Sequence, residues 1–363
     1  MKDRYPLLEI NLDKINQNLA FITDLCKERG ISVSGVVKGV NAIPEIVDIF
    51  MNGDCSHIAH SRMDQLRSIK KKGCKLPLML LRLPMLSEID ELVDIVDISL
   101  NSERKTLERI EEECIRQEKK HKVILMFDLG DLREGIIDEK EFEDLTVFTE
   151  NHLTQVELMG IGTNLGCYGS VKPTPENLGR LCRIAQKIEE RIGRKLEIVS
   201  GGATTSIPLI LEGTMPEGIN HLRIGEGILL GRDLVDLWGY DMPYIHKDTI
   251  VLKAQVIEVR EKPTYPIGEL FVDAFGKKPE YIDSGIRKRA ILAVGKQDFV
   301  FYDSLIPKLQ GVKIVGASSD HLIVDVEECG QEINLGDVME FEMFYGPMLY
   351  LTGSPSVEKK FIR

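Results

Sequence analysis

The chain has 363 residues, enough for two domains at about 150 residues per domain. Asp and Glu outnumber Lys and Arg by 58 to 46, and the net charge of −12 argues against nucleic acid or an anionic membrane as the main partner. A hydrophobic content of 43% excludes a disordered chain. No apolar run has the roughly 18 residues of a membrane span. The first residues lack an apolar secretory signal, and the seven cysteines show no C-x2-C spacing, so we expect reduced thiols in a cytoplasmic protein.

Helices and strands alternate from residue 13 to residue 224. Residues 13–29 are predicted to be helical, because apolar residues recur every three or four positions and Gly30 follows as a cap. The predicted strands are Ile31–Val37, Ser56–Ala59, Leu76–Leu83, Ile95–Leu100, Lys122–Phe127, Gln155–Ile161, Lys195–Val199 and Asn220–Ile224. The helices between them are Pro44–Asn52, Met63–Lys72, Leu86–Leu92, Ser102–Lys119, Glu139–His152, Pro175–Ile192 and Thr205–Glu212. Eight such units in about 200 residues predict a (β/α)8 barrel of the TIM type.

An open, doubly wound sheet is the alternative for this part of the chain. Such a sheet usually carries a glycine-rich phosphate turn after its first strand. Here the first strand is followed by Lys38-Gly-Val-Asn-Ala, which is not that turn, so the sequence favours the barrel.

The pattern changes after about residue 243, where long helices give way to short strands and turns. The predicted strands are Thr249–Arg260, Arg289–Val294, Gln297–Tyr302, Val312–Val315, His321–Val326, Val338–Phe344 and Tyr350–Leu351. We therefore expect a barrel domain over residues 8–240 and a β-rich domain over residues 241–363. The early strand, Leu7–Asn11 within residues 1–12, is expected to join the second domain.

The carboxyl ends of the barrel strands carry the residues that chemistry would need, because these ends meet at one mouth. The first strand ends at Lys38, and a partly desolvated lysine can serve as a nucleophile toward a carbonyl group. Two loops, Ser200–Thr205 and Ile224–Gly227, offer backbone N–H groups and hydroxyls suited to a phosphate group. Arg133 is a donor of the type that binds a carboxylate at two points.

These segments resemble the pyridoxal phosphate (PLP) enzymes of fold type III, the alanine racemase family, and within it the branch that includes ornithine racemases. Val36-Val-Lys38 is similar to the strand that carries the cofactor lysine, and Asp128-Leu-Gly-Asp-Leu-Arg133-Glu-Gly135 is similar to the segment D-T-G-M-G-R-x-G. Leu222-Arg223-Ile-Gly225 resembles R-x-G-I, in which the arginine faces the pyridine nitrogen. The resemblance implies these cofactor contacts: Lys38, Arg133, Asn164, Ser200, Thr204, Arg223, Gly225, Glu226 and Tyr345.

The resemblance also implies an isomerase that interconverts L- and D-amino acids, ornithine first, by transferring the α-proton between two bases. Lys38 would hold the cofactor and act as one base. Ala317-Ser-Ser319-Asp320 resembles a segment that reaches across a head-to-tail homodimer, so Ser319 and Asp320, with Arg133, are predicted to bind the substrate. No metal is implied. The open alternatives are a broader lysine/ornithine racemase, an alanine racemase, or a PLP-binding protein without catalysis.

Two features remain open at this point. Alanine racemases use a tyrosine of the β-rich domain as second base, and the matching stretch, Val272-Asp-Ala-Phe275-Gly276, has a phenylalanine there. Tyr281, His321, Cys167 or water are the candidates for that role. An acidic partner for a side-chain amine of the substrate would come from Asp131, Glu134, Glu226 or Asp283.

Overall fold

The computed structural model describes residues 3–276, 278 and 280–363. The described chain divides into two compact units. One, here called the barrel unit, holds residues 15–246. The other, the β-rich unit, holds the chain up to residue 14 together with residues 247–363. No helix among the described residues is long and apolar enough to cross a membrane.

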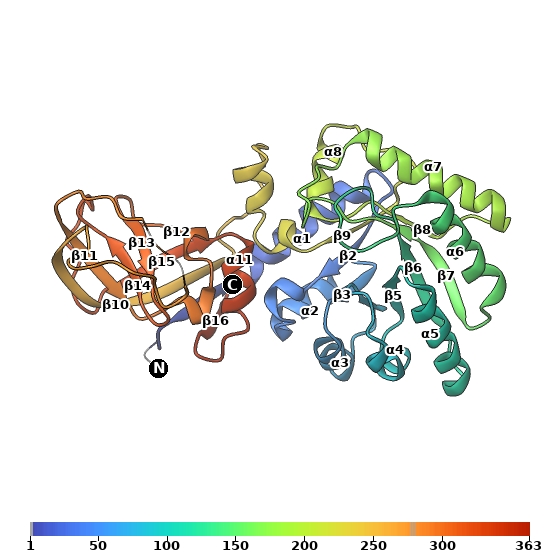
Figure 1. Ribbon diagram of the computed structural model, residues 1–363, viewed down its shortest axis with the longest axis horizontal. Coiled ribbons are helices and arrows are strands. Elements are labelled where there is room, and N and C mark those ends of the chain that lie inside the picture. The colour runs from blue at the N-terminus through green and yellow to red at the C-terminus, as the bar shows by residue number, and fades with distance from the viewer. Residues whose placement is uncertain (1–2, 277, 279) are drawn as a thin grey trace. The chain divides into compact units, whose positions relative to one another are not determined.

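The barrel unit contains a closed ring of eight parallel strands, as the sequence predicts (Figure 1). The ring closes where β2 pairs with β9, with Gly35 opposite Ile224. Its strands are β2 (Ser32–Val36), β3 (His57–His60), β4 (Leu78–Leu80), β5 (Ile98–Asn101), β6 (His121–Met126), β7 (Val156–Gly162), β8 (Ile198–Ser200) and β9 (His221–Ile224). All their carboxyl ends lie at one mouth, which fixes where the candidate site can form.

Helices follow the strands and surround the ring. Local signals set their ends: Pro44 opens α2, and at α7 the Thr174 side chain accepts the N–H of Asn177 while Gly193 ends the helix at φ 74°. The longer helices are α1 (Leu12–Lys27), α2 (Pro44–Asn52), α3 (Met63–Lys71), α4 (Ile89–Ile95), α5 (Arg104–Gln117), α6 (Glu139–His152) and α7 (Pro175–Ile192). Shorter segments are η1 (Lys38–Val40), η2 (Leu86–Glu88), η3 (Thr204–Ser206), α8 (Ile207–Leu211), α9 (Glu226–Leu229) and η4 (Asp233–Leu237).

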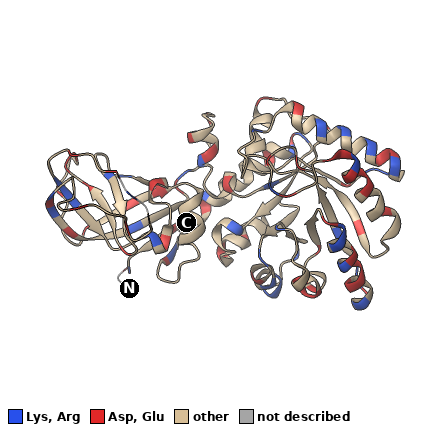
Figure 2. Cartoon of the chain, viewed as in Figure 1, with Lys and Arg blue, Asp and Glu red and all other residues tan. Residues whose placement is uncertain are grey.

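The inside of the ring is filled by apolar side chains from successive strands, among them Val36, Ala59, Met79, Leu100 and Ile124. Figure 2 shows the charged residues mainly on the surrounding helices, with the strands largely uncharged. Neighbouring helices exchange ion pairs there, such as Arg180 with Glu139 at 2.8 Å. In the barrel unit the charged side chains therefore gather on the helices that surround the ring.

The β-rich unit is built on an antiparallel sheet with the order β12-β15-β10-β11-β14-β13. As expected, the early strand joins this unit: β1 (Leu7–Asn11) pairs antiparallel with β10 and parallel with β16. The other strands are β10 (Ile250–Pro263), β11 (Ile286–Leu292), β12 (Leu305–Pro307), β13 (Lys313–Ala317), β14 (Leu322–Asp325), β15 (Val338–Met343) and β16 (Glu358–Ile362).

Two predicted strands of this unit are wrong. Residues 297–302 form α10 (Lys296–Phe299) and the start of η5 (Tyr302–Ser304), because Asp298 turns back to accept the N–H of Gly295 and so starts a helix. Tyr350 and Leu351 close α11 (Tyr345–Leu351) rather than forming a strand. The sequence prediction also missed the short strands β12 and β16.

Candidate active site

Lys38 lies directly after β2 at the barrel mouth, as the first residue of η1. The next turn is tight, with Asn41 and Ala42 at φ 48° and 53°. Lys38 is half-buried, and its amine makes no hydrogen bond or ion pair within the described part of the chain. Burial, and then the nearby Arg133, lower the pKa of Lys38. The site therefore holds an amine that loses its proton more readily than an ordinary lysine.

Arg133 reaches the same region from the loop that follows β6. The carboxylate of Asp128 shapes this loop by accepting the backbone N–H of Gly130 at 2.8 Å and of Leu132 at 3.2 Å. The Arg133 guanidinium pairs with Glu134 and donates to the Cys167 sulfur at 3.2 Å. The positive charge of Arg133 is thus held at the mouth, beside Lys38, where an anionic group can meet it.

Arg223 lies deeper, on β9, and only 5% of it is exposed. Its guanidinium donates to Ser200 Oγ and to the backbone carbonyl of Thr163, the latter at 2.8 Å. Burial lowers the pKa of Arg223 to about 10, so the group keeps its charge at neutral pH. The sequence places Arg223 and Ser200 at the mouth, and the structure joins them.

A line of buried polar groups continues from Arg223 into the barrel. Ser200 Oγ lies 2.8 Å from His221 Nδ1, His221 Nε2 lies 2.7 Å from Ser34 Oγ, and Ser34 Oγ lies 3.0 Å from His57 Nδ1. We call these five residues the Arg223 chain. Burial lowers the pKa of His57 to about 4 and lowers the pKa of His221 well below its ordinary value, so both rings are neutral at pH 7. Neutral rings let each group donate to the next, from Arg223 inward.

Sequence reasoning missed Ser34 and His221 and did not connect His57 with Arg223. One signal was present, since His221 stands two residues before Arg223 on one strand and so faces the same side. The partners on β2 and β3 follow only from the closure of the ring. His60 was missed in the same way: its Nδ1 accepts the N–H of Arg62 at 3.1 Å, and its Nε2 is buried without a partner in the described structure.

The predicted phosphate loops lie at adjacent strand ends. Thr204 is buried at the start of η3, and its Oγ accepts the N–H of Gly227 at 3.1 Å, which ties the two loops together. A Cβ on Gly225 would lie 2.9 Å from the backbone oxygen of Val36, so only glycine fits between this loop and the lysine strand. The result is a narrow cradle of backbone N–H groups and a hydroxyl.

The side chains of Glu226 and Asn164 differ in burial and in hydrogen bonding. The Glu226 carboxyl is buried and accepts the N–H groups of Arg232 at 2.9 Å and Asp233 at 3.1 Å. It therefore fixes the turn between α9 and η4. Burial chiefly, and then Asp233, raise the pKa of Glu226 to about 8. Asn164 is half-buried directly after β7, beside Thr163, whose own hydroxyl is buried without a partner in the described structure.

The remaining predicted residues belong to the β-rich unit. Ser319 and Asp320 lie in the turn between β13 and β14, and Tyr345 begins α11. Their roles in a site stay predictions. Among the described residues no group of three or more His, Cys, Asp or Glu side chains could hold a metal ion.

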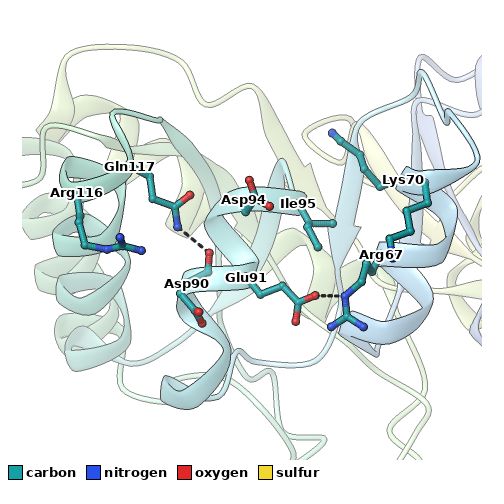
Figure 3. A pocket seen from close by; sticks show the side chains of 9 residues that line it. Arg67, Lys70, Asp90, Glu91, Asp94, Ile95, Arg116 and Gln117 are labelled. Atoms are coloured by element: carbon teal, nitrogen blue, oxygen red, sulfur yellow. Dashed lines mark hydrogen bonds and ion pairs between the residues drawn. The ribbon is translucent and has the colours of Figure 1, made fainter.

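A charged hollow of about 570 Å³ lies among helices α3, α4 and α5 (Figure 3). Arg67 pairs there with Glu91, and Gln117 donates to the carbonyl of Asp90 at 2.7 Å. Its lining residues sit on surrounding helices rather than at the strand ends. The hollow is therefore separate from the candidate site.

Comparison with known proteins agrees with this geometry. Residues 10–233 match the family model described as alanine racemase, N-terminal domain. The chain is 43% identical over 358 residues to an ornithine racemase of Acetoanaerobium sticklandii, covering 99% of this chain and 100% of that one. It is 40% identical to a lysine racemase of Thermotoga maritima, covering 98% of both chains.

Solved structures show the same fold at lower identity. An alanine racemase from a D-cycloserine-producing Streptomyces lavendulae has a TM-score of 0.75 at 15% identity, covering 100% of this chain and 98% of that one. An alanine racemase of Clostridium difficile 630 has a TM-score of 0.70 at 18% identity, with 99% and 97% covered. The lysine-bearing barrel mouth, the full-length relatives and the family match agree, and the chain belongs to the alanine racemase family.

Proposed function

We propose that the protein is a PLP-dependent amino-acid racemase that acts on ornithine and works as a homodimer in the cytoplasm. One observation carries the proposal: Lys38 presents an amine of lowered pKa, without a hydrogen-bonding partner among the described residues, beside a phosphate-type cradle and two arginines. The full-length similarity to an ornithine racemase supports the substrate. All seven cysteines are free, which fits a reducing compartment.

The residues present fit PLP. Gly225 and Gly227, with Thr204, supply the kind of cradle that a phosphate requires, at the start of a helical segment. Two buried polar atoms have no partner in the described structure: Thr163 Oγ, whose residue bonds to Arg223, and His60 Nε2, whose residue lies near Lys38. Buried polar groups of this kind normally have hydrogen-bond partners, so a polar ligand at the mouth would complete them.

When bound, PLP takes up the electron pair that the α-carbon keeps after losing its proton. The protein's own groups then do the remaining work. Lys38 in its neutral form removes or returns the α-proton, which its lowered pKa favours at neutral pH. Arg133 binds the substrate carboxylate or the cofactor at the mouth. Arg223 is charged and fixed by Ser200 and Thr163. It would face the ring nitrogen of bound PLP and would keep that nitrogen unprotonated, which would restrain side reactions.

A lysine racemase is the second candidate, because a relative of that activity is 40% identical over nearly the whole length. Ornithine and lysine differ by one methylene in the side chain, a difference that a pocket discriminates only about 10- to 200-fold. Dimer formation enters the proposal because Ser319 and Asp320 are predicted to reach the site of a partner subunit.

The first experiment is the visible spectrum of the purified protein with added PLP, followed by borohydride reduction and peptide mapping. We expect a reducible chromophore attached to Lys38, and none in Lys38→Ala. Chiral chromatography of ornithine, lysine and alanine incubations then ranks the substrates. A chromophore on another lysine, or no racemisation of any of the three by the loaded protein, would contradict the proposed function.

A further inference from the structure

We propose that Lys296, in the β-rich unit, is the second catalytic residue, and that it serves the Lys38 site of a partner subunit. The inference rests on the proposed function and deepens it, since it names the group that exchanges a proton on the substrate face opposite Lys38. Neither the family match nor the relatives assign a role to this lysine.

The barrel unit by itself supplies one suitable amine. Inverting a carbon centre requires the proton to leave on one face and return on the other, so a lysine fixed on one face needs a second proton-carrying group. Among the groups that influence Lys38 electrostatically, Arg133 and Arg223 hold their protons and Glu134 is paired with Arg133. Cys167 and His60 remain. The Cys167 sulfur already accepts a hydrogen bond from Arg133. Burial, and then Lys38, lower the pKa of His60 to about 4, so its ring carries no spare proton at neutral pH.

The β-rich unit fixes Lys296 beside the turn that is predicted to reach the substrate. The N–H of Lys296 donates to the carbonyl of Ser318 at 2.9 Å, and the N–H of Gln297 donates to that of Ser319 at 3.2 Å. The Gln297 side chain also donates to the carboxylate of Asp320 at 2.6 Å. A Cβ on Gly295 would overlap the carbonyl of Ser319, so α10 and this turn touch closely. Any ligand that meets Ser319 and Asp320 therefore comes near Lys296.

The side chain of Lys296 is held by aromatic rings. Its Nζ lies 3.9 Å from the centroid of the Phe275 ring and 5.6 Å from that of Tyr302. Within the described residues it has no ion pair, although acidic residues outnumber basic ones in the chain. Aromatic faces stabilise an ammonium group while leaving its N–H bonds unclaimed by a carboxylate. Lys296 is thus an amine with a defined position, and no carboxylate among the described residues binds it.

This arrangement explains the phenylalanine that the sequence places where a tyrosine was expected. Phe275 cannot carry a proton, but it lies against an amine that can. The other candidates of the β-rich unit are less suitable. His321 is bonded within its own turn to Ser318 Oγ at 3.2 Å. Tyr281 lies in the same β10–β11 loop as Phe275, but its ring packs edge-on to Tyr265, with 6.3 Å between the ring centroids.

The proton balance of the step is simple. On one face neutral Lys38 breaks the Cα–H bond and becomes an ammonium, while the electron pair stays with the cofactor-bound substrate. On the opposite face the Lys296 ammonium gives its proton to the α-carbon, forming the new C–H bond, and becomes neutral. The two lysines have exchanged protonation states, and the reverse reaction or solvent resets them.

The first test uses Lys296→Met, which keeps the length and apolar stem of the side chain, and Lys296→Arg, which keeps the charge but holds its proton. We expect both to bind PLP at Lys38 and to lose racemisation by about 10²- to 10⁴-fold. In deuterated water, Lys38 should still exchange the α-hydrogen of one enantiomer without inverting it. Equal loss of exchange from both enantiomers, or racemisation near the wild-type rate, would overturn the proposal. Lys313→Met, which removes a lysine paired with Glu328, is the matched control.

The second test mixes subunits. Lys38→Ala and Lys296→Met are each inactive alone, but a mixed dimer would contain one complete site if Lys296 acts across subunits. We expect activity to return on co-refolding or co-expression, and no return would overturn the assignment to a partner subunit. Cys167→Ser and His321→Gln test the rivals: loss of inversion with retained one-sided exchange in either, but not in Lys296→Met, would transfer the role. Failure of the wild type to racemise any amino acid would instead refute the proposed function itself.

Discussion

The two units of this protein bury polar groups in different ways. The barrel unit contains one set of buried groups that are linked across strands: Arg223, Ser200, His221, Ser34 and His57 bond in sequence. In the β-rich unit they are local, as when Thr352 donates to the carbonyl of Met348 one turn earlier, or Arg287 pairs with Asp325 across neighbouring strands. Burying linked polar groups costs desolvation free energy. Such networks occur where they hold a functional side chain in one orientation. The comparison thus indicates that the barrel interior is organised around Arg223.

The largest expected effect comes from reversing the charge at the head of the Arg223 chain. Arg223→Glu should keep cofactor on Lys38 but lower racemisation by about 10²- to 10³-fold, because it removes a preorganised charge. Transamination should rise relative to racemisation, since a glutamate would favour a protonated ring nitrogen. Pyridoxamine phosphate formation measured against D-amino acid formation gives the ratio. Arg223→Lys is the conservative comparison, and Arg287→Gln in the other unit should leave the ratio unchanged. An unchanged ratio in Arg223→Glu would contradict the assigned role.

Acid should unfold the barrel unit before the β-rich unit. Burial lowers the pKa of His57, His60 and His121 to about 4, so between an unfolded value of about 6.5 and that value the unfolded chain binds more protons. The stability that these neutral histidines support is complete above about pH 6.5. It is lost as the pH falls to about 4, by roughly 3 kcal/mol for each histidine at most. In the β-rich unit burial raises the pKa of Asp325, but Arg287 lowers it overall, so its contribution persists to lower pH.

The chain's single tryptophan makes the acid experiment specific. Trp238 belongs to the barrel unit, so its fluorescence reports that unit, while circular dichroism reports both. Urea midpoints should fall faster by fluorescence than by dichroism between about pH 6.5 and pH 4. Coincident midpoints across this range would show that the two units unfold together.

Glu226 should respond to pH in the opposite direction. Its folded pKa of about 8 lies above the ordinary value, so the folded state holds a proton that the unfolded state has lost, and stability falls as pH rises from about 4.5 to 8. Glu226→Gln keeps the shape and an acceptor for Arg232 and Asp233. The variant should therefore gain stability over the wild type above about pH 8, measured by urea unfolding. No gain there would mean that folding does not raise the pKa of Glu226.

The smallest expected effect is on PLP affinity, and it distinguishes two buried threonines, Thr204 and Thr352. Thr204→Val removes the hydroxyl that joins the cradle loops and should weaken PLP binding about tenfold, the value of roughly one hydrogen bond to a charged group. Thr352→Val in the β-rich unit should cost about 1 kcal/mol of stability and leave PLP affinity unchanged. Equal effects of both variants on PLP affinity would remove Thr204 from the phosphate site.

The barrel was more predictable from sequence than the β-rich unit, for a physical reason. A βα unit repeats a local signal: Pro44 and Gly193 mark helix ends, and buried strands are continuous apolar runs. The short helix α10 arises from a single reversal, where Asp298 accepts the N–H of Gly295, and its four residues carry too little periodicity to reveal it. The site follows the same division. Lys38 and Arg223 were found at strand ends, but Ser34 and His221 became visible only when the ring closed.

The pairing of β1 with β16 has a consequence for how the protein is made. Leu7 lies opposite Glu358, so a segment made before the barrel unit waits for a segment made after it before its pairing is complete. Residues 15–246 emerge in between and can fold as a unit during synthesis, since their contacts are internal to that stretch. Closing so long a loop is slow relative to local contacts. During synthesis one edge of β1 can pair with β10 once residues 250–253 are made, but its other edge stays unpaired until residues 358–362 follow.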